Sequence, residues 1–275
     1  MLLWDHRPVR RKVGVDLNRS TIMATSDVTK TFGGIRACSS ISISIDRGEI
    51  RGLIGPNGSG KTTLVNLLTG FYKADSGTIM LDGTDITRLP PDARVYMGMS
   101  RTFQITRVFP NLTVAENIAI GLHSRTSSNV IDALTRSGRH AREDTLIGEK
   151  CNGLSALVGL TGDLRMRAAA LSHGPRRLLE IARALASEPK ILLLDEPAAG
   201  MSAEEKERLM DTITRINDMG ITILLIEHDM RVVMPICHRV TVLNYGEVIS
   251  EGTPAAVQAD PLVIEAYLGK VSQSA

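Results

Sequence analysis

A glycine-rich segment between an apolar strand and a helix constrains the fold of this chain more than any other feature. Ile50–Ile54 is predicted to form a short buried strand, and Lys61–Leu68 is predicted to form a helix. The joining segment fits the phosphate-loop pattern Gly-x-x-x-x-Gly-Lys-Ser/Thr with the residues Gly55, Pro56, Asn57, Gly58, Ser59, Gly60, Lys61 and Thr62. Because glycines let backbone amides approach an anion closely, this arrangement predicts a site for the phosphates of a nucleotide.

The first turn of that helix supplies polar side chains to the predicted site. Lys61 adds a positive charge for the β- and γ-phosphates, and the hydroxyl group of Thr62 is a suitable ligand for Mg2+. Thr63, the next residue of the helix, is also predicted to bind the nucleotide. An ordinary glycine-rich turn is the alternative, and the position between a strand and a helix disfavours it.

Two further apolar strands are each followed directly by ionisable residues. Ile191–Leu194 precedes Asp195 and Glu196, and Ile221–Ile226 precedes Glu227 and His228. The carboxyl ends of parallel strands meet at the ligand crevice, so we expect Asp195, Glu196 and His228 to lie there, beside the phosphate loop. There Asp195 is predicted to bind the metal, Glu196 to act as general base towards the attacking water, and His228 to contact the γ-phosphate as a neutral imidazole.

The rest of the pattern predicts an α/β fold. Ile41–Ile45 alternates strictly between apolar and polar residues and precedes a tight turn, which favours an antiparallel strand. Further strands are predicted at Thr78–Leu81, Val240–Leu243 and Glu247–Ser250. Helices are predicted at Thr113–Ile120 (capped by Asn111 or Thr113), Pro175–Ser187 and Ala203–Asp218, and after Asp229. The polar stretch 123–142 is predicted to be an exposed connection. Apolar strands that alternate with helices predict a parallel sheet with helices on both faces.

The segment Leu171-Ser172-His173-Gly174-Pro175, which lies before a helix, resembles the LSGGQ signature of ABC-transporter ATPases. Together with the phosphate loop upstream and the acidic strand end downstream, the resemblance extends from about Thr29 to Gly269. It implies a P-loop NTPase (RecA-like) core with an N-terminal antiparallel β subdomain and an inserted α-helical subdomain. The implied limits are 21–104 and 188–275 for the ATP-binding α/β core and 105–187 for the α-helical signature subdomain.

This resemblance also implies the cofactors ATP and Mg2+ and adds site residues. Ser172 and Gly174 would bind the γ-phosphate of the nucleotide that a partner subunit holds. Gln104, in the segment that resembles the Q-loop, would contact the metal or the attacking water. Phe32, which lies 29 residues before Lys61, would stack on adenine, with core packing as the alternative.

Two residues depart from the signature of that family. His173 replaces the first glycine of the usual pair, and Pro175 replaces the usual glutamine. Proline is tolerated in the first turn of a helix, but it removes an amide donor from an anion site and is expected to weaken this half of the ATP site. The D-loop position is occupied by a loosely similar sequence, Ala199-Gly200-Met201-Ser202.

Several short segments resemble the ATPases of branched-chain amino-acid importers. They are Arg51-Gly52-Leu53-Ile54-Gly55, Leu67-Leu68-Thr69-Gly70-Phe71, Arg101-Thr102-Phe103-Gln104, Glu227-His228-Asp229-Met230 and the stretch from Asp260-Pro261 to Tyr267-Leu268-Gly269. The resemblance implies a peripheral subunit on the cytoplasmic face of the inner membrane. An ATPase of a urea or amide importer is the alternative, followed by an exporter ATPase or a soluble ABC ATPase that acts on ribosomes or DNA.

The implied partners follow from the same family. They are a second ABC ATPase subunit in a head-to-tail homo- or heterodimer, two integral membrane permease subunits and, indirectly, an external solute-binding protein. Each ATP site would then need two subunits, so a monomer is expected to hydrolyse ATP poorly. ATP binding would close the dimer, and hydrolysis would reset the membrane helices.

Composition excludes several other classes of protein. Aromatic residues make up 3% of the chain and the formal net charge is +2, so a nucleic-acid-binding surface is not expected. No apolar run reaches the length of a membrane span, and the three cysteines, too few and too scattered for a disulfide framework, are expected to be reduced thiols. Residues 1–20 carry a net charge of +3 and are predicted to be a basic N-terminal extension. One alternative is that the start codon is over-called and the protein begins near Met23; the other is that the extension is an arm that contacts anionic lipid.

Overall fold

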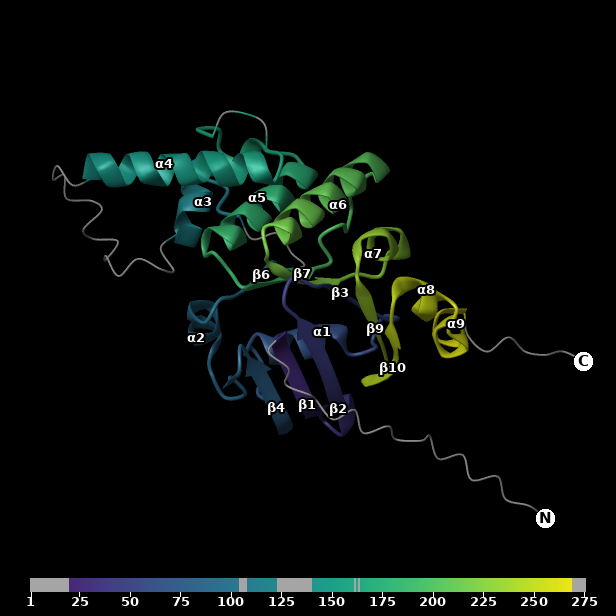
Figure 1. The fold of residues 1–275 in the computed structure, drawn as a ribbon. Helices are drawn as coiled ribbons and strands as arrows, with labels where there is room; N and C mark the ends of the chain where they lie inside the picture. Colours follow the sequence, from purple (N-terminus) through teal and green to yellow (C-terminus); the bar gives the residue numbers. More distant parts are fainter. Residues whose placement is uncertain (1–19, 104–107, 123–139, 161, 163, 269–275) are drawn as a thin grey trace, which may run out of the picture.

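The structure of this chain, a computed structural model, contains two β-sheets with helices packed around them (Figure 1). It describes residues 20–103, 108–122, 140–160, 162 and 164–268. The strands are β1 (Thr21–Phe32), β2 (Ile35–Asp46), β3 (Ile50–Ile54), β4 (Ser76–Leu81), β5 (Thr84–Asp85), β6 (Met99–Arg101), β7 (Ile191–Asp195), β8 (Thr222–Ile226), β9 (Arg239–Asn244) and β10 (Glu247–Gly252). The helices are α1 (Lys61–Leu68), α2 (Pro91–Tyr96), α3 (Val114–Leu122), α4 (His140–Leu157), α5 (His173–Ala186), α6 (Ala203–Asp218), α7 (Met230–Ile236), α8 (Pro254–Gln258) and α9 (Pro261–Leu268), with a 3-10 turn at Ala168–Ala170.

The larger sheet has six strands in the order β10-β9-β3-β8-β7-β6. Every neighbouring pair is parallel except β9 and β10, which form an antiparallel hairpin. The hairpin turns at Tyr245 and Gly246, both of which have positive φ, as a turn that matches the twist of the strands requires. The predicted parallel sheet is therefore confirmed, with one antiparallel edge strand added.

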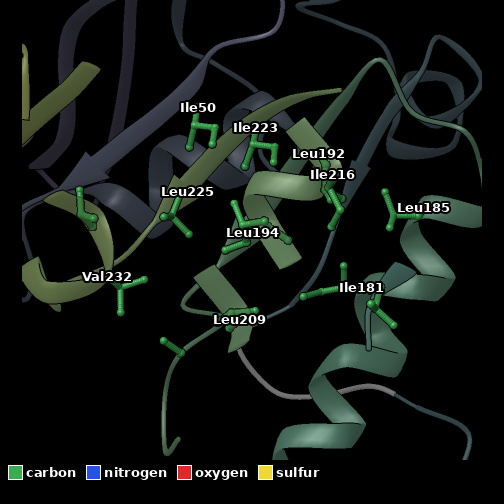
Figure 2. Close-up of a cluster of buried hydrophobic side chains, with 14 of the residues drawn as sticks. Ile50, Ile181, Leu185, Leu192, Leu194, Leu209, Ile216, Ile223, Leu225 and Val232 are labelled. Carbon is green, nitrogen blue, oxygen red and sulfur yellow. The ribbon is translucent and has the colours of Figure 1, made fainter. Parts of the chain in front are cut away.

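Helices and the second sheet cover the two faces of the large sheet. On β7, Leu192 and Leu194 point to one face and pack in the same cluster as side chains of α5 and α6 (Figure 2). Leu193 points to the opposite face and joins a second cluster that includes α1 and the smaller sheet. Burial on both faces explains why these strands are continuous apolar runs and not alternating ones.

The smaller sheet is antiparallel, with the strand order β2-β1-β4-β5. Its strand β2 extends well beyond the predicted Ile41–Ile45, and β1 was not predicted from the sequence. The pairing of β1 with β2 contains register shifts, and Asp27 and Ser40 have positive φ within these strands. Bulges of this kind interrupt the alternation of polar and apolar residues on which a sequence-based prediction depends.

Helices α3, α4 and α5 pack together on the side of the large sheet that is remote from the antiparallel sheet (Figure 1). Thr113 is the residue that caps α3: its hydroxyl group accepts from the amide of Glu116, whose carboxylate accepts from the amide of Thr113. The predicted connection 123–142 was wrong at its end, because residues 140–142 belong to α4. Its remainder, 123–139, and residues 1–19 lie outside the described residues.

The three cysteines of the chain are buried free thiols, as predicted. Among the described residues, the structure contains no helix that has the length and apolar character needed to span a bilayer.

Candidate functional site

The predicted phosphate loop connects the buried carboxyl end of β3 to the first turn of α1. Gly60 is the N-cap of α1 and provides no side-chain acceptor, and the first turn contains no acidic residue. The first amide groups of an α-helix have no partner within the helix and carry partial positive charge. The loop therefore has the backbone geometry and the electrostatics of an anion site.

Two glycines of this loop cannot be replaced without a clash. Gly55 and Gly60 have positive φ. A Cβ atom on Gly60 would lie 2.5 Å from the carbonyl oxygen of Ala37, and one on Gly55 would overlap the carbonyl oxygen of Leu243. The loop is thus pressed against the backbone of β2 and β9, and only glycine permits this approach.

We expect Gly60→Ala to lower the free energy of unfolding by about 1–3 kcal/mol, because the left-handed conformation and the clash both penalise a side chain. ATP affinity should fall about tenfold through displacement of the loop amides, which corresponds to the loss of one hydrogen bond to a charged group. Thermal unfolding and nucleotide titration measure the two effects. Gly220→Ala is the matched control, since Gly220 has a φ of 87° but no atom within 4 Å of an added Cβ. Equal loss of affinity in both variants would contradict the expectation.

Lys61 folds back over the phosphate loop. Its Nζ donates to the carbonyl oxygens of Gly55, at 2.7 Å, and Pro56, at 3.0 Å. Burial lowers the pKa of Lys61, and the nearby carboxylates of Glu196 and Asp195 act in the opposite direction. The loop lysine and the two strand-end carboxylates are thus brought within electrostatic range, as the sequence predicted.

Asp195 ends β7 and is almost fully buried. One carboxylate oxygen, Oδ2, accepts a hydrogen bond from Arg101 Nη2 at 2.7 Å, and Arg101 also donates to Asn66 Oδ1. The guanidinium group stacks near the rings of Phe71 and Phe103. Sequence reasoning gave Arg101 no role. Its charge compensates the Asp195 carboxylate, which would otherwise be costly at this depth.

The residues at this position fit a magnesium ion. No group of three or more His, Cys, Asp or Glu side chains within the described part of the chain is arranged to hold a metal. Mg2+ in nucleotide sites takes one or two protein oxygens and completes its shell with phosphate oxygens and water. The carboxylate of Asp195 and the exposed hydroxyl group of Thr62 are donors of the required chemistry.

Glu196 and His228 lie side by side at the ends of adjacent strands. The Nδ1 atom of His228 is 3.9 Å from Oε1 of Glu196. The side chain of His228 is 55% exposed and that of Glu196 is 19% exposed. Glu196 has a φ of 47°, in the left-handed region that a residue with a side chain seldom adopts. Strain of this kind costs of order 1–3 kcal/mol and persists only where neighbouring contacts hold it.

Phe32 lies at the end of β1 with 42% of its surface exposed. Its ring makes an edge contact with Tyr72 at a centroid distance of 5.3 Å, and the ammonium group of Lys30 lies 5.4 Å from the ring centre. The exposed surface is inconsistent with a purely core-packing role. It leaves aromatic area on which a base can stack.

The predicted signature forms the start of α5. Ser172 is the N-cap and is exposed, and its hydroxyl group makes no capping hydrogen bond. Gly174 is buried against the side chain of Glu205, and the ring of His173 lies beside Gly200. The helix begins at His173, two residues before the predicted start, with Pro175 in its first turn. Among the described hydrogen bonds, none joins Ser172 or Gly174 to the phosphate loop of the same subunit.

Gln104 lies outside the described residues, so its predicted contact with metal or water stays a prediction. The structure adds three charged side chains to which the sequence analysis assigned no role: Arg177, Glu180 and Glu227, each buried. Arg177 and Glu180 could have been noticed as charged residues on the core-facing side of an amphipathic helix. Glu227 could have been given a role because a carboxylate directly after a fully apolar strand is expected to be buried.

Comparisons with known proteins agree with this geometry. Residues 38–199 match the family described as ABC transporter. The chain belongs to the ABC transporter family. A second, more specific family, described as branched-chain amino acid ATP-binding cassette transporter, matches residues 247–271.

Curated ABC relatives resemble the chain over nearly its whole length. The high-affinity branched-chain amino acid transport ATP-binding protein BraF of Pseudomonas aeruginosa is 38% identical over 250 residues, which cover 90% of this chain and 98% of the relative. LivG of Escherichia coli, with the same description, is 39% identical over 252 residues, with the same coverage.

Solved ABC structures have the same fold. An ATP-binding cassette of an ABC transporter in its ADP conformation has a TM-score of 0.79 and 33% identity, and covers 91% of this chain and 99% of its own. A dimeric post-hydrolysis cassette bound to ADP and Pi has a TM-score of 0.72 and 25% identity, and covers 85% of this chain and 99% of its own. The fold class predicted from the sequence, a P-loop NTPase core with an antiparallel β subdomain, is confirmed, and the chain is an ABC ATPase that binds ATP.

Proposed function

We propose that this chain is the ATP-binding and hydrolysing subunit that energises an importer of branched-chain amino acids. The observation that carries the proposal is the grouping of Glu196, His228 and Asp195 at strand ends, with the two carboxylates within electrostatic range of the phosphate-loop lysine. The substrate class is supported by the descriptions of BraF and LivG and by the match of the C-terminal residues 247–271. An importer of urea or amides and a soluble ATPase on ribosomes or DNA are less well supported.

The site residues act as follows in this proposal. The loop amides and Lys61 bind the phosphates, Phe32 stacks on adenine, and Glu196 accepts a proton from the attacking water. His228 donates a hydrogen bond to the γ-phosphate. Gln104 contacts the water or the metal. The full nucleotide-binding set is Phe32, Gly55, Pro56, Asn57, Gly58, Ser59, Gly60, Lys61, Thr62, Thr63, Ser172 and Gly174.

Asp195, Thr62 and Gln104 are the proposed ligands of Mg2+. When bound, the ion neutralises charge on the β- and γ-phosphates. The chain's own contribution is the orientation of Asp195, because Arg101 holds one carboxylate oxygen and the other stays available.

A second ABC ATPase subunit completes each nucleotide site in this proposal. Ser172 is exposed and its hydroxyl group makes no capping hydrogen bond, which suits a contact with the γ-phosphate held by a partner. The partner binds head-to-tail as a homo- or heterodimer, with two permease subunits above it and a solute-binding protein outside. The assembly places the chain on the cytoplasmic face of the inner membrane. The core comprises 21–104 and 188–275, and the signature subdomain 105–187.

Uptake measurements test the proposal. In a deletion strain, the wild-type chain should restore uptake of labelled leucine, whereas Glu196→Gln should not. Glu204→Gln is the matched control, since Glu204 is an exposed glutamate in the first turn of α6 and should restore uptake fully. Restoration of urea or amide uptake without leucine uptake would replace the substrate class. Recovery of the chain on ribosomes, without membrane subunits, would refute transport.

A further inference from the structure

The segment around the strained backbone of Glu196 is held by contacts from two elements, strand β8 with the residue that follows it and helix α5. Its amide donates to the carbonyl oxygen of Ile226, at the end of β8, over 2.9 Å. Its carbonyl oxygen accepts from Nη2 of Arg177, on α5, over 3.3 Å. Two residues later, the amide of Ala198 donates to Oε1 of Glu227 over 2.8 Å. The segment that carries the proposed general base is thus fixed on both sides.

Glu227 is buried, and its one ionisable partner among its described contacts is the imidazole of His228, whose Nδ1 lies 4.0 Å from Oε2. It is 1% exposed, and its second carboxylate oxygen accepts the amide of His228 at 3.2 Å. Burial raises the pKa of Glu227, while the amides of Ala198 and His228 act in the opposite direction. Burying a carboxylate is costly, and here the charge is compensated mainly by backbone donors from two functional segments. The side chain therefore joins the Glu196 segment to the His228 segment.

Arg177 makes an equivalent connection from the signature helix. Its guanidinium group pairs with Glu180 at 2.8 Å and donates to the carbonyl oxygen of Phe103 at 2.5 Å. Glu180 in turn accepts the amide of Phe103. The buried pair thus links α5 to the residue before Gln104 as well as to Glu196. A guanidinium group suits this task because its donors have fixed directions.

We propose that Glu227 and Arg177 are positioning residues that hold Glu196 and His228 in the arrangement required for hydrolysis. The proposal rests on the role of Glu196 as general base. If either side chain is lost, the backbone of Glu196 can relax out of its left-handed conformation, and its carboxylate moves relative to the attacking water. Nucleotide binding depends on the phosphate loop and should be affected little. The effect should therefore fall on kcat and not on KM.

The test uses Glu227→Gln in the complete transporter in lipid vesicles. Glutamine keeps the shape, but an NH2 group replaces one of the two oxygens that accept the Ala198 and His228 amides, so one of these hydrogen bonds is lost. We expect kcat to fall about 10- to 100-fold, as for a displaced catalytic group. The KM for ATP and the Kd of a fluorescent ATP analogue should stay within about twofold of wild type.

Glu49→Gln is the matched control for burying an amide in place of a carboxylate. Glu49 is also buried, and it accepts the amide of Asp46 and pairs with Arg51 at the amino end of β3, away from the strand ends. A loss of stability with unchanged kcat is expected for this variant. An equal fall of kcat in both variants would assign the Glu227 effect to general destabilisation and overturn the proposal.

Arg177→Lys provides a second test that does not depend on the folding of Glu227→Gln. One ammonium group cannot reproduce the directed contacts to Phe103, Glu180 and Glu196, so kcat should fall with little change in ATP affinity. Unchanged kcat in either folded variant, or a rise in KM alone, would overturn the proposal. If Glu196→Gln itself kept wild-type turnover, the proposed base would fail instead, which distinguishes the two failures.

Discussion

Lys61→Ala is expected to abolish nucleotide binding at working concentrations of ATP. In the structure Nζ already lies over the loop, where it donates to Gly55 and Pro56, so the charge sits at the anion site before ATP arrives. Hydrogen bonds to charged groups contribute about 1.5–3 kcal/mol each, so loss of the phosphate contacts should raise the Kd of ATP on the order of 100-fold. Fluorescent-nucleotide titration and isothermal calorimetry measure this directly.

Lys73→Ala is the matched control for removing a lysine side chain. Lys73 is exposed and follows α1. Its removal should leave the Kd of ATP unchanged. The variant Lys61→Ala should also stay folded, because the carbonyl groups that accept from Nζ, those of Gly55 and Pro56, belong to the loop and not to a strand or helix. Wild-type ATP affinity in folded Lys61→Ala would contradict the role of the phosphate loop.

Glu196→Gln is expected to lower ATP turnover about 10²- to 10⁴-fold, the usual contribution of a positioned general base. Glutamine has a similar shape but cannot accept the proton of the attacking water. ATP binding should persist, because Lys61 and the loop amides are unchanged. The variant should therefore accumulate with ATP bound in the complete transporter. Single-turnover hydrolysis and the ratio of ATP to ADP in the trapped complex provide the measurement.

The position of Glu196 beside His228 gives this prediction a second check. The two side chains are 3.9 Å apart, so His228→Ala should also reduce turnover, and the double variant should lose less than the product of the two effects. Glu204→Gln, on the neighbouring helix α6, should turn over ATP at the wild-type rate. Full activity of Glu196→Gln in the assembled complex would show that another residue activates the water.

Local sequence was sufficient for the phosphate loop and for the strands beside it. The predicted limits of β3 and α1 agree with the structure to the residue, because buried apolar runs and glycines leave few alternatives for the local backbone. The strand-end positions of Asp195, Glu196 and His228 followed from the rule that parallel strands present their carboxyl ends at one edge. Strand β1 was not predicted, because bulges interrupt its alternation of polar and apolar residues.

The sequence by itself determined the class of fold, the phosphate loop and the carboxylates beside it, because each depends on short motifs with a fixed local geometry. The tertiary structure alone decided how these groups are held. The left-handed backbone of Glu196, the pairing of Arg101 with Asp195 and the burial of Glu227 all involve residues that are brought together by strand order. Contacts between residues far apart in the chain leave no local motif in the sequence, whereas a loop that must turn tightly around a phosphate requires glycines at fixed spacings.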